Sequence, residues 1–216
     1  MASSNVAVME LPPSVVSNAK EEQLRILFTQ LPNLSLGNIL GTGILIILYQ
    51  KLVAPAVLWS WVGINLLLAA VATPLLIWRY RRDATHRKPA RWMREVVWLS
   101  FLRTCVWGVL PLAFYLHGRI EYELINFIFV LVGVSMALLF SAPHRPIFFA
   151  IVPPILVPVT LLFVIEGGDI RLALAAGSLF YGLMLYRMFN RLHANCIRSI
   201  GSSPSVVRRN GRMTRS

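Results

Sequence analysis

Six runs of apolar residues, separated by short breaks that contain charges, glycines or prolines, constrain the fold of this chain more than any other feature. They span residues 34–49, 57–78, 96–116, 124–140, 147–165 and 172–188. About 20 apolar residues in a helix cross the hydrocarbon core of a bilayer. Of the 216 residues, 56% are hydrophobic and 14% are charged, which excludes a disordered chain and a large soluble enzyme. We therefore predict an all-α, polytopic integral membrane protein with six transmembrane helices.

The segment before the first run divides into two parts. Residues 1–33 contain no basic region followed directly by an apolar region, so a cleaved signal peptide is not expected. Residues 1–17 are predicted to form a flexible N-terminal lead. Asn18 and Glu21 have the spacing of a capping box, and the apolar stretch that follows them is too short to span. We predict a short amphipathic helix at the membrane interface over residues 18–33. The predicted transmembrane domain covers residues 34–192, and a basic, disordered cytoplasmic tail covers residues 193–216.

Basic residues in the breaks predict the orientation of the helices. Lys and Arg are retained on the cytoplasmic side of a membrane, and this chain carries 21 of them against nine Asp and Glu. With six spans and the N-terminus inside, 17 basic residues fall in inner segments, and only Lys51, Arg119 and Arg171 fall in outer segments. Both termini are therefore predicted to be cytoplasmic.

Seven of the inner basic residues lie in the break between the second and third spans, where we expect them to contact anionic lipids of the inner leaflet. They are Arg79, Arg81, Arg82, Arg87, Lys88, Arg91 and Arg94. In a soluble chain the net charge of +12 would suggest nucleic acid as a partner. Attraction to anionic lipid also explains the basic tail, so nucleic acid is not the expected partner.

Arg103, in the third run, is the one Asp, Glu, Lys or Arg deep within the predicted spans, since Arg187 lies at the cytoplasmic end of the sixth run. A charge in hydrocarbon is costly and commonly marks a functional site. Two interpretations are open. The long side chain can extend along the helix to the cytoplasmic headgroups, or it can be a buried functional cation.

Small residues at four-residue spacing occur in two spans, where they allow close helix packing. Gly37 and Gly41 form one such pair, and Ser178 and Gly182 form the other. Packing within one chain is the simpler interpretation, and a homodimer through one of these faces is the alternative.

Three prolines in the fifth run, Pro153, Pro154 and Pro158, each remove a helical hydrogen bond. We expect this helix to be kinked or broken. A broken helix can line a ligand cavity, although prolines also serve packing alone in membrane helices.

No catalytic constellation is visible, so we do not expect an enzyme. The sequence contains no HExxH, GxSxG, GxxxxGK or CxxC motif. The four histidines are not placed in facing spans, and Cys105 and Cys196 are expected to be free thiols. We therefore predict no metal and no cofactor.

Four segments carry a likeness to a known family. They are EEQLRILFTQLP (21–32), LLIWRYRR (75–82), RWMREVVWLSFLRTCVWGVLPL (91–112) and VLVGVSMALLFS (130–141). Together they resemble the six-helix membrane sensor module at the N-terminus of bacterial sensor histidine kinases and GGDEF-type diguanylate cyclases. The likeness covers residues 21–192.

The resemblance implies a sensory input module in a bacterial inner membrane, within a two-component or cyclic-di-GMP signalling pathway, with a cytoplasmic signalling partner. In that family the last helix continues into an output domain. The residues after Leu192 contain neither a phosphoacceptor-helix pattern nor a GGDEF string. We therefore expect a module without its own catalytic output domain, and one hypothesis is a truncated receptor. The alternatives are a small permease or channel subunit and a membrane scaffold.

Overall fold

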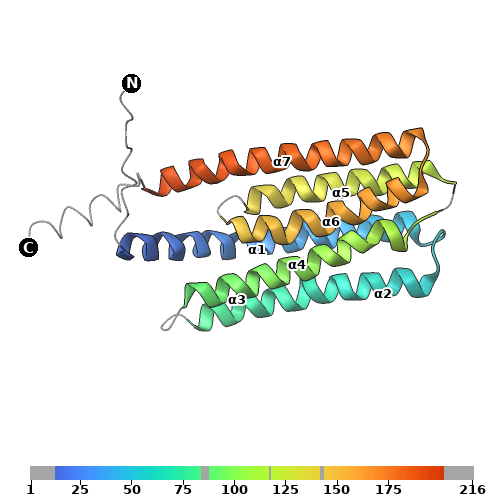
Figure 1. Ribbon diagram of the computed structural model, residues 1–216. Coiled ribbons are helices and arrows are strands. Elements are labelled where there is room, and N and C mark those ends of the chain that lie inside the picture. Colours follow the sequence, from blue (N-terminus) through green and yellow to red (C-terminus); the bar gives the residue numbers. More distant parts are fainter. Residues whose placement is uncertain (1–12, 84–87, 117, 142–143, 202–216) are drawn as a thin grey trace, which may run out of the picture.

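The computed structural model describes residues 13–83, 88–116, 118–141 and 144–201, which form a bundle of helices with roughly parallel axes (Figure 1). No strand occurs in these residues. In chain order the elements are α1 (Pro13–Tyr49), α2 (Pro55–Leu66), η1 (Leu67–Ala72), α3 (Thr73–Arg82), α4 (Pro89–Ala113), α5 (Ile120–Ser141), α6 (Arg145–Glu166) and α7 (Asp169–Gly201). The prediction of an all-α bundle is confirmed.

Five helices of the described chain are long and apolar enough to cross a membrane, over residues 24–49, 55–82, 89–113, 145–166 and 169–195. Helix α5, with 22 residues, lies beside them in the bundle (Figure 1). Five or six helices of the structure therefore have membrane-spanning character.

The second of these spans is one continuous rod made of α2, η1 and α3. Its middle turn, η1, is a π-helix. Pro74, two residues after the end of η1, has no N–H to donate. The hydroxyl of Thr73 donates to the carbonyl oxygen of Leu68 at 2.8 Å. The wider turn and the side-chain hydroxyl together accommodate the proline without breaking the rod.

Helix α1 differs from the predicted arrangement. A separate interfacial helix over residues 18–33 is not confirmed, because α1 continues without a break from Pro13 to Tyr49 and includes Pro32. Leu24, Leu27, Phe28 and Leu31 are buried in the bundle. The ring of Phe28 stacks on Tyr80 of α3, with 3.7 Å between centroids. Packing against α3 therefore holds this segment in line with the rest of α1.

The predicted ends of the chain also shift. Residues 13–17 of the predicted lead belong to α1, and residues 193–201 of the predicted tail belong to α7. The remaining parts of both predictions, residues 1–12 and 202–216, lie outside the described residues.

Helix α6 runs unbroken from Arg145 to Glu166, although it contains three prolines. A proline leaves the carbonyl four residues earlier without its helical donor, so Pro154 frees the oxygen of Ala150 and Pro158 frees the oxygen of Pro154. The hydroxyl oxygen of Thr104 on α4 lies 2.8 Å from the Ala150 oxygen. Helix α4 thus supplies a donor where α6 lacks one, and the expected break is not observed.

The second freed carbonyl explains Gly108 of α4. A Cβ atom built at Gly108 would lie 2.0 Å from the carbonyl oxygen of Pro154, so only a glycine lets the two backbones approach this closely. The α4–α6 contact therefore depends on one residue without a side chain.

We expect Gly108→Ala to lower the free energy of unfolding by about 1–3 kcal/mol, because the added methyl group pushes α4 away from α6. Thermal unfolding in detergent measures the change. Gly63→Ala is the matched control, since a Cβ at Gly63 meets nothing within 4 Å. Equal melting temperatures for the two variants would contradict the assignment.

Candidate functional site

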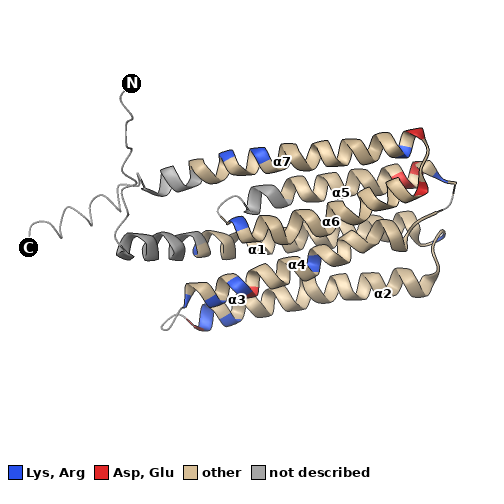
Figure 2. Cartoon of the chain, in the orientation of Figure 1, with Lys and Arg blue, Asp and Glu red and all other residues tan. Residues whose placement is uncertain are grey.

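Arg103 lies midway along α4 and is directed into the bundle. Figure 2 shows the other basic residues of the described helices near the ends of the bundle, with one blue segment halfway along α4. Arg103 is only 6% exposed. A side chain that extends along the lipid-facing surface to the headgroups would be exposed, so the structure favours the buried cation.

Ser35 and Asn38 of α1 receive the guanidinium group. Nη2 of Arg103 donates to the hydroxyl oxygen of Ser35 at 2.9 Å. With the Asn38 amide oriented to satisfy its neighbours, its oxygen accepts from Nε of Arg103 at 3.2 Å and from Nε1 of Trp107 at 2.9 Å. Two residues of α1 therefore hold one cation and one indole of α4.

The same amide continues the network to α2. The nitrogen of Asn38 donates to the side-chain oxygen of Asn65 at 3.1 Å, and Nδ2 of Asn65 donates to the hydroxyl of Thr42 at 3.2 Å. Thr42 donates to the backbone oxygen of Asn38 at 2.9 Å. We call the six residues Ser35, Asn38, Thr42, Asn65, Arg103 and Trp107 the Arg103 network.

All partners of Arg103 in this network are neutral. Among the described residues, Arg103 forms no ion pair with a carboxylate. Hydrogen bonds from a charged donor are stronger than those between neutral groups, but they replace only part of the solvation that the guanidinium loses in the bundle. The network therefore holds a positive charge without a carboxylate partner in the interior of the bundle.

Asn38→Ala removes the acceptor that serves both Arg103 and Trp107. We expect this change to lower the free energy of unfolding by about 2–4 kcal/mol, because it leaves a buried charge with fewer partners. In an Arg103→Met background the same substitution should cost at least about 1 kcal/mol less, since the charge is gone.

Denaturant or thermal unfolding in detergent gives the four free energies of this double-mutant cycle. Asn126→Ala is the control in both backgrounds, because the Asn126 amide accepts from Tyr49 and does not belong to the network. Additive effects of Asn38→Ala and Arg103→Met would show that the two residues are not coupled.

A second group of polar residues lies near the end of the bundle where α5 and α7 begin. Glu123 of α5 and Arg171 of α7 form a two-pronged ion pair, with N–O distances of 2.7 and 2.8 Å. The Glu123 side chain is 3% exposed and the Arg171 side chain is 21% exposed. Beside them, the hydroxyl of Tyr49 donates to Oδ1 of Asn126 at 2.9 Å.

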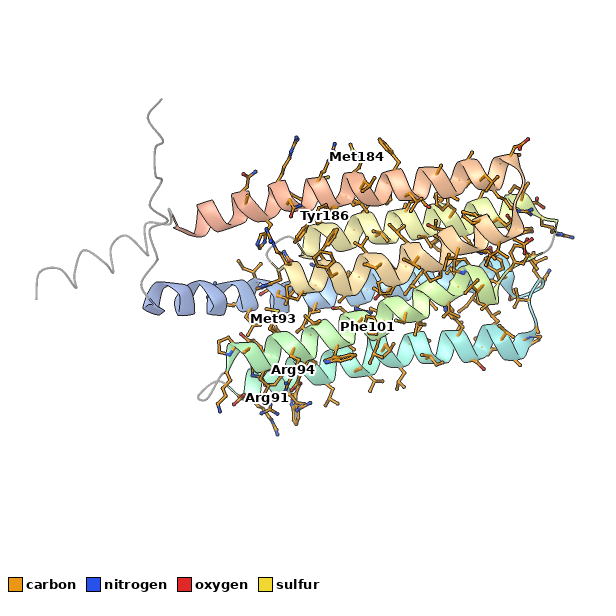
Figure 3. The ribbon with its side chains drawn as sticks, in the orientation of Figure 1. Arg91, Met93, Arg94, Phe101, Met184 and Tyr186 are labelled. Carbon is orange, nitrogen blue, oxygen red and sulfur yellow. The ribbon has the colours of Figure 1, made fainter. Side chains whose placement is uncertain are left out.

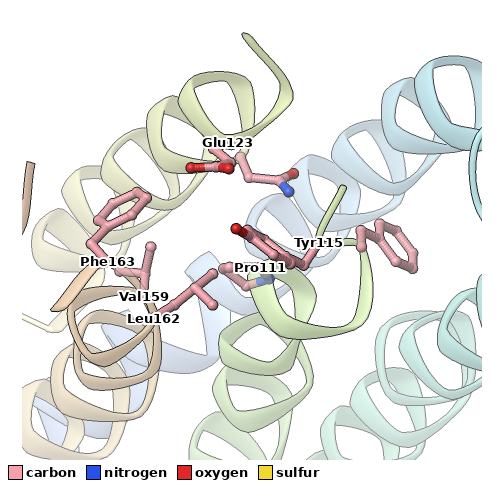
Figure 4. Close-up of a pocket in the computed structure, with 8 residues that line it drawn as sticks. Pro111, Tyr115, Glu123, Val159, Leu162 and Phe163 are labelled. Carbon is pink, nitrogen blue, oxygen red and sulfur yellow. The ribbon is translucent and has the colours of Figure 1, made fainter. Parts of the chain in front are cut away.

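A cavity of about 10 Å³, the size of one water molecule, adjoins this group (Figure 4). Figure 4 shows Glu123 and Tyr115 on its rim, with apolar side chains of α4 and α6 around them. Its lining residues are Pro111, Phe114, Tyr115, Glu123, Asn126, Val159, Leu162 and Phe163. Pro153, Pro154 and Pro158 of α6, for which a cavity and packing alone were both open, are not among these lining residues.

Tyr115 lies in the turn after α4, outside the membrane-spanning segments. Burial, with a hydrogen bond to Glu166 as the next contribution, raises the pKa of Tyr115 to about 12. The phenol is therefore neutral at physiological pH and donates to the Glu166 carboxylate. Its contribution to stability is present below the unfolded-state pKa of 10.0 and is lost as the pH rises from there to about 12.

Glu123→Gln tests the ion pair. The amide cannot balance the charge of Arg171, and we expect the free energy of unfolding to fall by about 1–3 kcal/mol, less than for a pair with both partners fully buried. Glu121→Gln, an exposed residue in the same turn of α5, should change it by less than about 0.5 kcal/mol. Similar melting temperatures for both variants in detergent would show that the ion pair is not important for stability.

The small residues predicted to pack helices lie in different surroundings. A Cβ at Gly37 would meet nothing within 4 Å, whereas one at Gly41 would lie 3.2 Å from the ring of Trp107. Gly41 thus makes room for an indole of the Arg103 network. The hydroxyls of Ser178 and Thr160 lie 2.6 Å apart, and a Cβ at Gly182 would lie 3.3 Å from Leu156, so both residues contact α6.

The basic residues predicted to meet lipid gather at the α3–α4 end of the bundle. Arg79, Arg81, Arg82, Lys88, Arg91 and Arg94 are all exposed there, and Arg87 lies outside the described residues. Within the described side chains, no group of three or more His, Cys, Asp or Glu could hold a metal ion.

Sequence reasoning did not identify several members of these clusters. Ser35, Thr42 and Trp107 of the Arg103 network were not predicted. Helical spacing offered a signal, since the buried residues of α4 include Val96, Ser100, Arg103 and Gly108, which recur every three to five positions. The outward positions between them are apolar, so this periodicity places Arg103 on the inward face.

No protein-family model, no curated protein and no solved structure matches this chain.

Proposed function

We propose that this chain is the membrane-embedded input module of a signalling receptor, which passes a change in helix packing through α7 to a cytoplasmic partner. The observation that carries the proposal is the length of α7. This helix begins at the Glu123–Arg171 ion pair and continues for 33 residues to Gly201. Its last turns extend beyond the ends of α4, α5 and α6 (Figure 1).

The charge distribution supports the orientation that this function requires. The basic end of the bundle is the end where α7 terminates, and acidic residues gather at the opposite end (Figure 2). By the positive-inside rule the basic end is cytoplasmic. The proposed arrangement is six spans in a bacterial inner membrane with both termini in the cytoplasm, as the family resemblance also implies.

Polar contacts join α7 to α6 and α6 to α4, the helix that carries Arg103. Ser178 of α7 bonds to Thr160 of α6, and Ala150 of α6 accepts from Thr104 of α4. Thr104 is the neighbour of Arg103, which bonds to α1. A displacement of α4 can therefore reach α7 through α6, which packs against both helices, and a stimulus that favours one arrangement shifts the population of α7 positions.

The test changes the rotation of the C-terminal end of α7 relative to the rest of the helix and measures the output of a fused domain. A reporter kinase domain is fused after Gly201, and one alanine is inserted after Ala194. One residue rotates the following helix by about 100°, whereas seven residues complete nearly two full turns. We expect the single insertion to change kinase output roughly fivefold or more and the seven-residue insertion to restore it.

A single alanine inserted after Lys51, in the turn between α1 and α2, is the control and should leave the output unchanged. Membrane levels of all fusions are compared by immunoblot. Equal output from the one-residue and seven-residue insertions would contradict transmission through α7.

A permease or channel subunit is the second candidate, because a buried cation within a membrane bundle also suits an anionic solute. That function needs a continuous pathway, and the described cavity near Glu123 holds only about one water molecule. Anion flux into vesicles that contain the purified chain, and its loss in Arg103→Met, would favour this candidate over the input module.

A further inference from the structure

The outward face of the α3–α4 pair carries a second feature, independent of the Arg103 network. Arg82, Trp78 and Leu75 of α3 and Val71 of η1 are exposed at spacings of three or four residues, so they follow one another along one face of the continuous rod. On α4, Arg94, Trp98 and Leu102 are exposed at four-residue spacing. We call these seven residues the α3–α4 surface.

The surface consists of two stripes, one along η1 and α3 and one along α4, and in each stripe the type of side chain changes along the helix. Each stripe begins with an arginine at the end of the bundle, continues with a tryptophan, and ends with aliphatic side chains. The guanidinium of Arg82 lies 3.9 Å from the centre of the Trp78 ring. Trp98 is 58% exposed and meets the edge of Phe101, and Figure 3 shows Phe101 farther from the end of the bundle than Arg91 and Arg94.

The acidic residues nearby leave this surface positively charged. Glu95 pairs with Arg79 at 3.5 Å and with Arg91 at 3.3 Å, and Asp83 accepts from Nε1 of Trp92 at 3.0 Å. Among the described residues, Arg82 and Arg94 have no carboxylate partner. The described residues of 79–95 contain six basic and two acidic side chains, so this part of the bundle attracts anions.

We propose that the α3–α4 surface binds an anionic phospholipid. The phosphate lies between Arg82 and Arg94, the rings of Trp78 and Trp98 lie at the level of the glycerol and ester groups, and the acyl chains follow Leu75, Val71 and Leu102. The order of cation, aromatic ring and aliphatic side chain matches the order of groups in the lipid. Glu95 forms ion pairs with both Arg79 and Arg91. Arg82 and Arg94 are therefore left to bind the headgroup.

The apolar part of the surface distinguishes a lipid from other phosphate compounds. Nucleic acid and free phosphate both satisfy arginines, but neither has a hydrocarbon chain that would cover Val71, Leu75 and Leu102. An anionic phospholipid covers both parts of each stripe.

The experiment uses the full chain purified in a neutral detergent, with bound lipid counted by native mass spectrometry and the melting temperature measured in parallel. The probes are phosphatidylglycerol, the zwitterionic phosphatidylcholine, glycerol phosphate and a single-stranded RNA. We expect phosphatidylglycerol alone to bind and to raise the melting temperature.

Two double variants distinguish a specific lipid site on the α3–α4 surface from non-specific electrostatic attraction of the lipid to basic residues. Arg82→Gln with Arg94→Gln should weaken phosphatidylglycerol binding roughly tenfold or more. Arg187→Gln with Arg191→Gln makes the same change of charge at exposed residues of α7 and should leave binding nearly unchanged. Trp98→Leu keeps the charge and should shorten the residence of the lipid. Unchanged elution and melting temperature of the lipid-free variants show that they fold.

Three results would overturn the proposal. Equal loss of binding in both double variants would show diffuse electrostatic attraction. Displacement of the lipid by glycerol phosphate would show a phosphate site without acyl contacts, and binding of RNA in its place would show a nucleic-acid surface.

Discussion

The arrangement of this bundle depends on one constraint, which is that polar groups in hydrocarbon must find partners inside the protein. Arg103 makes the constraint most severe, because its guanidinium is buried in the interior of the bundle and needs acceptors there. Helix α1 supplies these acceptors through Ser35 and Asn38. Asn38 in turn donates to Asn65 of α2. These hydrogen bonds fix the positions of α1, α2 and α4 relative to one another. Without them the same polar side chains would be left unpaired in an apolar surrounding, which is unfavourable.

The same constraint explains why the prolines of α6 do not break it. Each proline removes a donor, and the carbonyl left behind must bond elsewhere or be reached by a close neighbour. Thr104 provides a hydroxyl for Ala150, while Gly108 permits the backbone of α4 to approach Pro154. Weak contacts from a Cα–H group to a carbonyl oxygen contribute at such crossings. The prolines therefore determine which residues α4 must place opposite α6.

The apolar runs were sufficient to predict the helices, because length and hydrophobicity alone decide which segments suit a membrane. They could not predict that α1 is continuous, since that depends on the packing of Phe28 against Tyr80, 52 positions away in the chain. The depth of Arg103 followed from its position and its inward direction from the spacing along α4, but its partners on α1 depended on the order of the helices in the bundle. The pairing of Glu123 with Arg171 is likewise a matter of helix order in the bundle, which local patterns do not contain.

Helix α4 connects the two features that we assign to function. Its inward face carries Arg103, and its outward face carries Arg94 and Trp98 of the α3–α4 surface. All three lie in one unbroken helix from Pro89 to Ala113, so a displacement of one face along or about the helix axis moves the other as well. Because the charge of Arg103 has only neutral partners, small changes in their geometry alter its energy strongly in a medium of low dielectric constant. The proposed lipid on the outer face and the buried charge on the inner face would therefore act on the same rigid element.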